Sequence, residues 1–226
     1  MNMADSGKAG MQTKLFSVYQ ILRERYGDLH WWPAKTPYEV MVGAILTQNT
    51  AWTNVDKALD NLRPDRLHAE IIARMPREEL IDAIRPAGFF NQKSTYLKAL
   101  TAWFAQYDYD AEAVRRHPLK QLRAELLATK GVGQETADDI LLYAFNKPTF
   151  IVDAYTNRLL HRIPIEAGKN NTEIKTFCES QLPRSVELYN SFHALIVTNA
   201  KEHCRKRPLC NNCPLFDQCS KMGILF

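Results

Sequence analysis

The chain has 226 residues, of which 46% are hydrophobic and 24% charged, and its formal net charge is +4. An ordinary apolar fraction that charge does not outweigh excludes a low-complexity disordered protein. The longest apolar runs, 40–46 and 140–145, are far shorter than the roughly 20 residues of a membrane-spanning helix, so we expect a globular chain without a membrane partner.

The chain begins with a polar segment, 1–14, that is rich in small residues and lacks the apolar stretch of a signal peptide. We expect this segment to be a flexible tail. Without a secretion signal, and with an odd number of cysteines, the chain does not fit a disulfide scaffold. We therefore expect a cytoplasmic protein.

Apolar residues recur at three- and four-residue spacing through most of the remaining chain, which is the period of an amphipathic helix. Proline and glycine separate these segments, and no segment keeps the strict alternation of a half-buried strand. The best strand candidate, 150–152, is too short to support a sheet. The pattern predicts an all-α protein of about ten helices. The stripes are Leu15, Val18, Tyr19 and Leu22; Val55, Ala58, Leu59 and Leu62; Leu80, Ile81 and Ile84; Leu97, Leu100, Trp103 and Phe104; and Leu188, Phe192, Leu195 and Ile196.

Residues 126–141 have the pattern of two helices joined by a tight turn, Gly131-Val132-Gly133. The two glycines can adopt backbone angles that other residues avoid, and we expect them to expose N–H groups at a helix N-terminus, where a DNA phosphate can bind. Val132 is expected to point into the core. Because G-x-G is a common pattern, a plain connection between helices is the alternative. Asp153, which follows 150–152 and opens a predicted helix, would by itself be an N-cap.

Four cysteines lie near the C-terminus with the spacing C-x5-C-x2-C-x5-C: Cys204, Cys210, Cys213 and Cys219. Four thiolates on a short loop can hold a tetrahedral metal ion or an iron–sulfur cluster. Structural zinc sites usually show two close pairs, and disulfides fit poorly with a reducing cytoplasm. One close pair with two longer arms fits a [4Fe–4S] cluster best, with zinc as the main alternative. Cys178, alone in a helical segment, is predicted to be a small buried side chain.

Together, the glycine turn, Asp153 and the four-cysteine loop resemble the helix–hairpin–helix superfamily of base-excision DNA glycosylases, the endonuclease III group. The resemblance extends from about Leu15 to Cys219. It implies two helical lobes with a DNA-binding cleft between them. Residues 37–145 would form a barrel-like lobe ending in the hairpin, and residues 15–36 and 146–226 a lobe carrying the cluster loop. It also implies that Asp153 is the catalytic aspartate and that the cysteines hold a [4Fe–4S] cluster, although the first cysteine arm is one residue shorter than usual.

The resemblance also bears on the reaction. Endonuclease III carries a lysine two residues after the second hairpin glycine, and this lysine forms a Schiff base with the sugar. Here that position is Glu135, and a carboxylate cannot form an imine. The implied chemistry is monofunctional: Asp153 stabilises an oxocarbenium-like sugar and positions or activates a water while the base leaves. Lys130, just before the hairpin, is expected to contact a phosphate rather than to replace the missing lysine.

Further segments resemble one subgroup, the 3-methyladenine DNA glycosylases of the endonuclease III type, and imply an alkylated purine as the base. These are Trp31-Trp32-Pro33, Thr47-Gln48-Asn49-Thr50, the block 85–93, and the hairpin continuation Glu135-Thr136-Ala137-Asp138. A methylated base carries positive charge that an aromatic face attracts. At least one of the candidate tryptophans is expected to belong to the core. The subgroup lacks a four-cysteine loop, so the chain combines two sets of features. The expected base pocket is Trp31, Trp32, Gln48, Asn49 and Trp52.

Basic residues lie where this fold would place them near DNA, after Asp153 and around the first cysteine arm. They include Arg162, whereas His193 and His203 are expected to be surface or packing residues. We expect a monomer whose partner is double-stranded DNA with a damaged base, associated with the nucleoid if the source is bacterial. The alternatives are a bifunctional glycosylase and AP lyase acting on oxidised pyrimidines, and a non-catalytic lesion-binding module. The expected DNA contacts are Lys130, Gly131, Val132, Gly133, Thr136, Arg158 and Arg205.

Overall fold

The computed structural model describes residues 3–29, 31–32 and 34–221. Within these ranges the chain forms twelve α-helices with short 3-10 and π segments, and none of these residues is in a β-strand. The prediction of an all-α fold is confirmed. None of the helices in the described ranges has the length and apolar character needed to cross a membrane. The chain divides into two compact units, residues 1–31 with 148–226 (unit 1) and residues 32–147 (unit 2).

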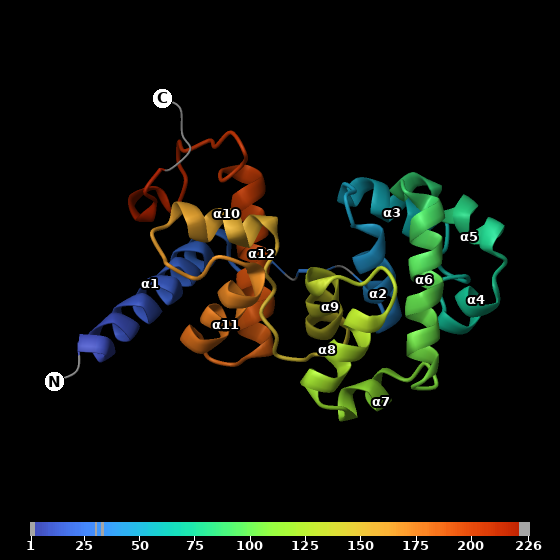
Figure 1. Cartoon of the computed structure of the whole chain (residues 1–226). Coiled ribbons are helices and arrows are strands. Elements are labelled where there is room, and N and C mark those ends of the chain that lie inside the picture. The colour runs from blue at the N-terminus through green and yellow to red at the C-terminus, as the bar shows by residue number, and fades with distance from the viewer. Residues whose placement is uncertain (1–2, 30, 33, 222–226) are drawn as a thin grey trace. The chain divides into compact units, whose positions relative to one another are not determined.

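Unit 2 is built around helix α2 (Pro37–Leu46), which is buried along almost its whole length. Its N-terminus is fixed by Thr36, whose side chain accepts a hydrogen bond from the Glu39 N–H at 3.1 Å. Helix α6 (Phe90–Ala105) packs against α2 and against three further helices of this unit (Figure 1). The other elements are α3 (Trp52–Asp60), α4 (Ala69–Arg74), α5 (Arg77–Ile84), η1 (Arg85–Ala87), α7 (Ala111–Arg116), α8 (Leu119–Ala128), α9 (Gln134–Asp139) and the π-helical η2 (Ile140–Ala144).

A buried lysine in unit 2 fixes the loop that follows α2. Lys93 of α6 is 2% exposed, and its ammonium donates to Leu46 O at 2.7 Å, Thr50 Oγ1 at 2.7 Å and Ala87 O at 2.9 Å. Burial lowers the pKa of Lys93 to about 8, so the ammonium is still mostly protonated at neutral pH. It therefore joins the C-terminal end of α2 to the end of η1, and holds the loop 47–50 between them.

Unit 1 consists of α1 (Met3–Tyr26), α10 (Ala154–Arg162), α11 (Asn171–Gln181), α12 (Val186–Glu202) and the short η3 (Phe216–Gln218). Helix α12 packs against α1 and α10, and α1 also packs against α11 (Figure 1). Aromatic side chains join these helices: the Phe192 ring lies 5.4 Å from Tyr19 and 5.9 Å from Phe150. Cys178 is fully buried, as predicted.

The expectation of a flexible tail over 1–14 stays a prediction, and in the structure α1 begins within this segment, at Met3. The segment contains alanine, lysine, methionine and glutamine, which favour the helix and outweigh two interior glycines. The apolar stripe that begins at Leu15 anchors the rest of α1, since Leu15, Val18 and Leu22 are fully buried. The helix therefore propagates backward from an anchored segment, which a reading of local polarity does not predict.

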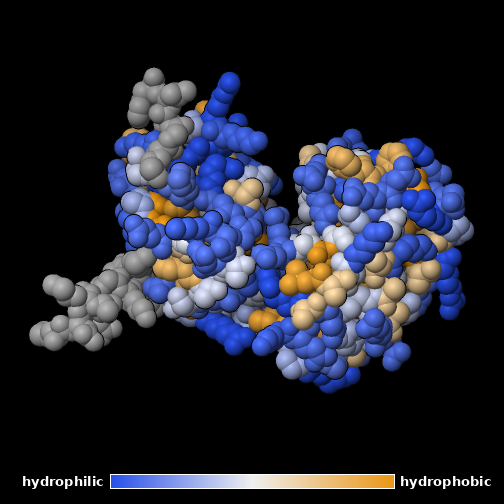
Figure 2. Space-filling view, viewed as in Figure 1, coloured by the Kyte–Doolittle hydropathy of each residue, from blue (hydrophilic) through white to orange (hydrophobic). Residues whose placement is uncertain are grey.

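The apolar stripes predicted for both units supply most of the core. The visible face of each unit is correspondingly mostly hydrophilic, with apolar residues in small patches (Figure 2). Large exposed apolar side chains in the described ranges are few. They are Ile71, Phe89, Leu127, Leu209 and Phe216.

Candidate active site and cysteine loop

The predicted hairpin is present as α8, a turn over 129–133 and α9. Gly131 has φ +88°, and a Cβ at this position would lie 2.0 Å from the Tyr96 ring. Gly133 has φ −88°, and a Cβ there would meet nothing within 4 Å. Gly133 therefore has an ordinary backbone conformation that other residues can adopt, whereas Gly131 does not. Val132 is buried as predicted.

The loop after α2 contacts the hairpin directly. Gln48 Nε2 donates to Gly131 O and to Thr136 Oγ1, each at 3.0 Å. Thr136 is buried, so its side chain is engaged inside unit 2. Asn49 is exposed with φ +52°, at the tip of this loop. The structure thus brings together Gln48 and the glycine turn, two features that lie more than eighty residues apart in the chain.

The candidate tryptophans lie in both units. Within unit 2, Trp32 contacts Trp52 edge-on at 5.6 Å between ring centroids and stacks on Tyr143 at 4.9 Å. Trp31 belongs to unit 1. Of the candidates, Trp32 and Trp52 are partly buried and pack against the core of unit 2. Trp32 and Trp52, which are partly exposed, form an aromatic cluster with Tyr143.

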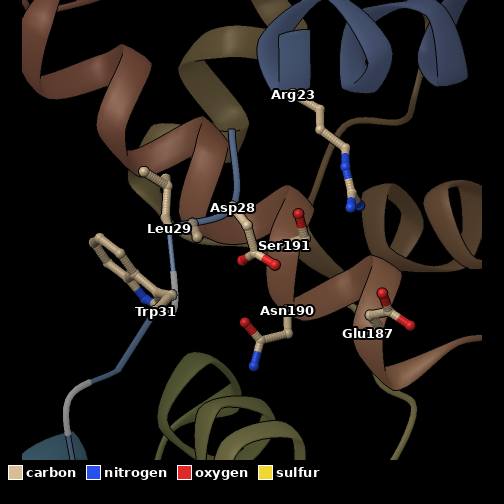
Figure 3. Close-up of a pocket in the computed structure, with 8 residues that line it drawn as sticks. Arg23, Asp28, Leu29, Trp31, Glu187, Asn190 and Ser191 are labelled. Atoms are coloured by element: carbon tan, nitrogen blue, oxygen red, sulfur yellow. The ribbon is translucent and has the colours of Figure 1, made fainter. Parts of the chain in front are cut away.

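Trp31 lines a pocket within unit 1 (Figure 3). Its indole ring lies 5.4 Å from Lys201 Nζ, and its Nε1 is buried without a hydrogen-bond partner among the described residues. The remaining lining residues come from the end of α1, the segment after it, and α12. They are Arg23, Asp28, Leu29, Glu187, Asn190, Ser191 and Ala194.

Asp153 is the N-cap of α10, and its two carboxylate oxygens face different partners. Oδ1 accepts a hydrogen bond from the Thr156 N–H at 2.7 Å, and Oδ2 lies 3.6 Å from His193 Nε2. Asp153 is 6% exposed. Burial by itself raises the pKa of Asp153, but His193 and the Thr156 N–H outweigh it, so the pKa is lower than usual. This buried carboxyl is consequently ionised at neutral pH.

His193 was expected to be a surface or packing residue, and its burial agrees with this, but its position beside Asp153 was not predicted. It is buried on α12, between Asn190 and Ala194, which line the Trp31 pocket. A histidine within the apolar stripe of 188–196 was the only signal in the sequence, and it does not identify a partner. His203 Nδ1 donates to Leu209 O at 3.1 Å, which fits a packing role in the cysteine loop.

Glu135 and Lys130 lie on either side of the glycine turn in unit 2. Both are exposed, and Glu135 is in the first turn of α9, where a carboxylate is favoured by the helix dipole. Glu135 therefore stands, exposed, at the position that the family resemblance implies for a lyase lysine.

The four C-terminal cysteines line one pocket in unit 1. Burial raises the pKa of the Cys213 thiol, and the charges of Cys204, Cys210 and Cys219 raise it further, as expected for sulfur atoms that lie close together. In the described part of the chain, no group of three or more His, Cys, Asp or Glu side chains is arranged to hold a single metal ion. The candidate donor set in this part of the chain is four cysteine thiols that line one pocket.

Arginines from α10 hold the cysteine loop. Arg162 is 7% exposed and donates to Cys204 Sγ at 3.2 Å and to Arg205 O at 2.8 Å. Arg158 Nε donates to Cys204 O at 2.6 Å. The expectation that Arg162 belongs to a basic surface is wrong, because its guanidinium is used inside the loop. Arg205 itself is exposed.

Residues 42–184 match the HhH-GPD superfamily of base excision DNA repair proteins. The chain is 45% identical over 210 residues to a protein of Methanocaldococcus jannaschii provisionally named a DNA repair glycosylase, covering 91% of this chain and 95% of that one. It is 28% identical to endonuclease III of Sulfolobus acidocaldarius over 191 residues, 80% of this chain and 81% of that one.

The chain is also similar to solved structures of a 3-methyladenine DNA glycosylase and of an endonuclease III. The 3-methyladenine DNA glycosylase of H. pylori, bound to 1,N6-ethenoadenine, superposes with a TM-score of 0.72 at 29% identity, covering 82% of this chain and 96% of that one. An endonuclease III trapped covalently on DNA gives a TM-score of 0.79 at 22% identity, covering 93% and 95%. At 22% identity, the similarity to this endonuclease III shows a shared fold.

Proposed function

The chain belongs to the HhH-GPD superfamily of base excision DNA repair proteins, and we propose that it is a monofunctional DNA glycosylase that releases alkylated purines from damaged double-stranded DNA. DNA glycosylase activity follows from the family, while the base and the reaction mode are the proposal. One observation carries it: a buried, ionised aspartate stands at the N-terminus of α10, and the position of the lyase lysine is Glu135.

In this reaction the bond between the sugar and the base breaks first, which leaves positive charge on the sugar. The Asp153 carboxylate stabilises that charge, directs a water to the sugar carbon and accepts the proton that the water loses as the new C–O bond forms. Because Oδ1 is occupied by the Thr156 N–H, we assign this role to Oδ2, which lies 3.6 Å from His193 Nε2. An alkylated purine is already a good leaving group, so little acid catalysis is required.

The substrate class is supported by the relative bound to 1,N6-ethenoadenine, a modified purine. On the DNA side, we propose phosphate contacts from Lys130, the turn 131–133, Arg158 and Arg205.

We also propose that Cys204, Cys210, Cys213 and Cys219 hold a [4Fe–4S] cluster. Four thiols that line one pocket, as one close pair in sequence with two longer arms, fit a cluster. When bound, it would fix the basic loop as a rigid unit. Stoichiometric iron and sulfide with absorbance near ~400 nm would support the cluster, and stoichiometric zinc without sulfide would exclude it.

The function is tested by measuring base release from duplexes that carry 3-methyladenine, 7-methylguanine, thymine glycol, uracil or a mismatch. We expect release of the methylated purines, and its loss in Asp153→Asn. Release of thymine glycol in preference would favour the oxidised-pyrimidine alternative. Release of no base at all would favour the non-catalytic binding module.

The reaction mode is tested by borohydride trapping on the same duplexes. The wild-type protein is expected to give no covalent adduct, because Glu135 cannot form an imine. Glu135→Lys serves as the positive control, since it restores an amine at an exposed position of α9. A wild-type adduct that disappears in Lys130→Ala would establish lyase chemistry and overturn the monofunctional mode.

A further inference from the structure

We propose that His193 is a positioning residue that holds the Asp153 carboxylate in its reactive orientation, an inference that rests on the proposed role of Asp153. A carboxylate that caps a helix through one oxygen can still rotate its second oxygen over a range of directions. In this protein the second oxygen is held as well, by a histidine from a different helix. The pair therefore defines where Oδ2 points.

The distances to the two carboxylate oxygens support separate roles for Thr156 and His193. The Thr156 N–H takes Oδ1 at 2.7 Å, and His193 Nε2 lies 3.6 Å from Oδ2, at ion-pair distance. Hydrogen bonds of catalytic groups are often long in the absence of substrate and shorten in the complex. Asp153 and His193 are both buried, 6% and 6% exposed, so water screens their interaction only weakly.

The helix that carries His193 is a firm support. The neighbouring Phe192 is fully buried and lies 5.9 Å, ring to ring, from Phe150, which precedes Asp153 by three residues. Tyr189, one turn earlier on α12, lies 5.5 Å from the same ring. The segment leading to Asp153 is thus packed against the same face of α12 that presents His193, and this limits relative movement of the two side chains.

The position of His193 on α12 also relates it to the Trp31 pocket. Asn190 lies three residues before His193 and Ala194 directly follows it, and both line that pocket. Residues three apart share a helix face. One turn of α12 therefore contributes both to the pocket and to the support of the carboxylate.

A purely structural ion pair is the alternative, and removing one partner of a buried pair is often destabilising without any effect on chemistry. The two roles differ in what they predict. A structural role lowers stability and leaves the rate of base release by the folded protein unchanged. A positioning role lowers that rate while DNA affinity is kept, because a misplaced reacting group costs rate rather than binding.

The test compares His193→Leu and His193→Gln in the full chain, using single-turnover base release from a 3-methyladenine duplex. Binding is measured separately on a duplex with a stable abasic analogue. We expect His193→Leu to release base about 10- to 100-fold more slowly with unchanged DNA affinity. His193→Gln, which places an amide nitrogen near the position of Nε2, is expected to recover most of the lost rate. His161→Leu, the same change at an exposed position of α10, is the control.

Thermal melting separates folding from chemistry, and rates are compared at temperatures where each variant is folded. If His193→Leu releases base at the wild-type rate while Asp153→Asn is inactive, the positioning role is overturned and the proposed function stands. Failure of His193→Gln to recover any rate also contradicts it. If Asp153→Asn releases base normally, the proposed function itself fails.

Discussion

At the residue scale, Asp153 could be identified from the sequence, but its environment could not. The apolar run before it and the helix after it predicted an N-cap, and the Thr156 N–H bond to Oδ1 confirms this. Its catalytic role stays a prediction. His193 lies forty residues further along the chain, and contacts of that kind arise only when two helices pack. Local spacing carries no information about them.

The lowered pKa of Asp153 makes stability depend on pH in a way that Asp153→Asn removes. A carboxyl whose folded pKa lies below its unfolded value stabilises the fold above the unfolded value, and this stabilisation is lost as pH falls through the folded pKa. The ordinary value is 3.8. We therefore expect the urea midpoint of the wild-type protein to fall more steeply than that of Asp153→Asn below about pH 5.

In this comparison the other carboxyls titrate in both proteins and cancel. Circular dichroism at a series of pH values gives the two midpoints. Parallel curves down to the acid limit of folding would show that the pKa of Asp153 is not lowered in the folded state.

At the element scale, the hairpin glycines offer a matched pair of substitutions. In Gly131→Ala, the methyl group would have to displace the Tyr96 ring and adopt φ +88°. We expect a loss of unfolding free energy of about 1–3 kcal/mol or more. Gly133→Ala meets open space at φ −88°, so its effect on stability should be within about 1 kcal/mol.

The same pair separates stability from DNA binding. Gly133 lies at the exposed N-terminus of α9, where a methyl group would crowd a phosphate. Gly133→Ala is accordingly expected to weaken DNA binding while folding normally. Urea unfolding and fluorescence anisotropy measure the two effects. Equal destabilisation by both substitutions would contradict the distinction between the glycines.

Lys93 allows a second prediction at this scale. Lys93→Met keeps the length of the side chain but leaves Leu46 O and Ala87 O buried without their donor. Each unsatisfied buried acceptor is costly, whereas burial of the methionine offsets part of the loss, so we expect a destabilisation of about 2–4 kcal/mol.

Lys120→Met, at an exposed position of α8, is the control and should change stability by less than about 0.5 kcal/mol. Urea midpoints compare the two variants. If Lys93→Met is as stable as the control, then the ammonium does not hold the loop 47–50, and the placement of Gln48 must depend on its own bonds to the hairpin.

Whether an element could be predicted depends on whether the local sequence or the tertiary packing determines it. Helices with a buried stripe, such as those containing Leu15 and Leu97, were predictable because the spacing of apolar residues in the local sequence indicates which face of the helix is buried. The start of α1 at Met3 was not, since helix extension depends on an anchored neighbour. The family resemblance led us to expect Gln48 near the base. Its hydrogen bonds to Gly131 and Thr136 join distant parts of the chain, so only the structure could reveal them.

At the scale of the whole molecule, the all-α class was predictable because spacing and breakers recur along the entire chain. The boundary between the two units was harder to predict, because residues that are adjacent in sequence can belong to different units. Trp31 and Trp32 are neighbours in sequence but belong to different units. Cysteine spacing was a better guide, because a short loop restricts how far its ligands can separate, and the four thiols do line one pocket.

The distribution of charge over the molecule leads to a prediction about binding. A formal net charge of +4 is small, and one of the expected surface cations, Arg162, is buried in the cysteine loop. We expect DNA binding to depend on where the exposed cations lie rather than on the net charge, and Arg205 is an exposed cation that we propose to contact a phosphate. Each phosphate contact releases counterions and adds about 0.9 to the slope of log affinity against log salt concentration.

Arg205→Ala is accordingly expected to weaken binding and to reduce that slope by about 1, whereas Asp153→Asn should leave the slope unchanged because it removes no cation. Anisotropy titrations of an abasic-analogue duplex between about 50 and 300 mM salt provide the slopes. Iron content checks that the substitution leaves the loop intact. An unchanged slope in Arg205→Ala with an intact loop would mean that Arg205 makes no phosphate contact, and that the cations of the hairpin side supply the affinity.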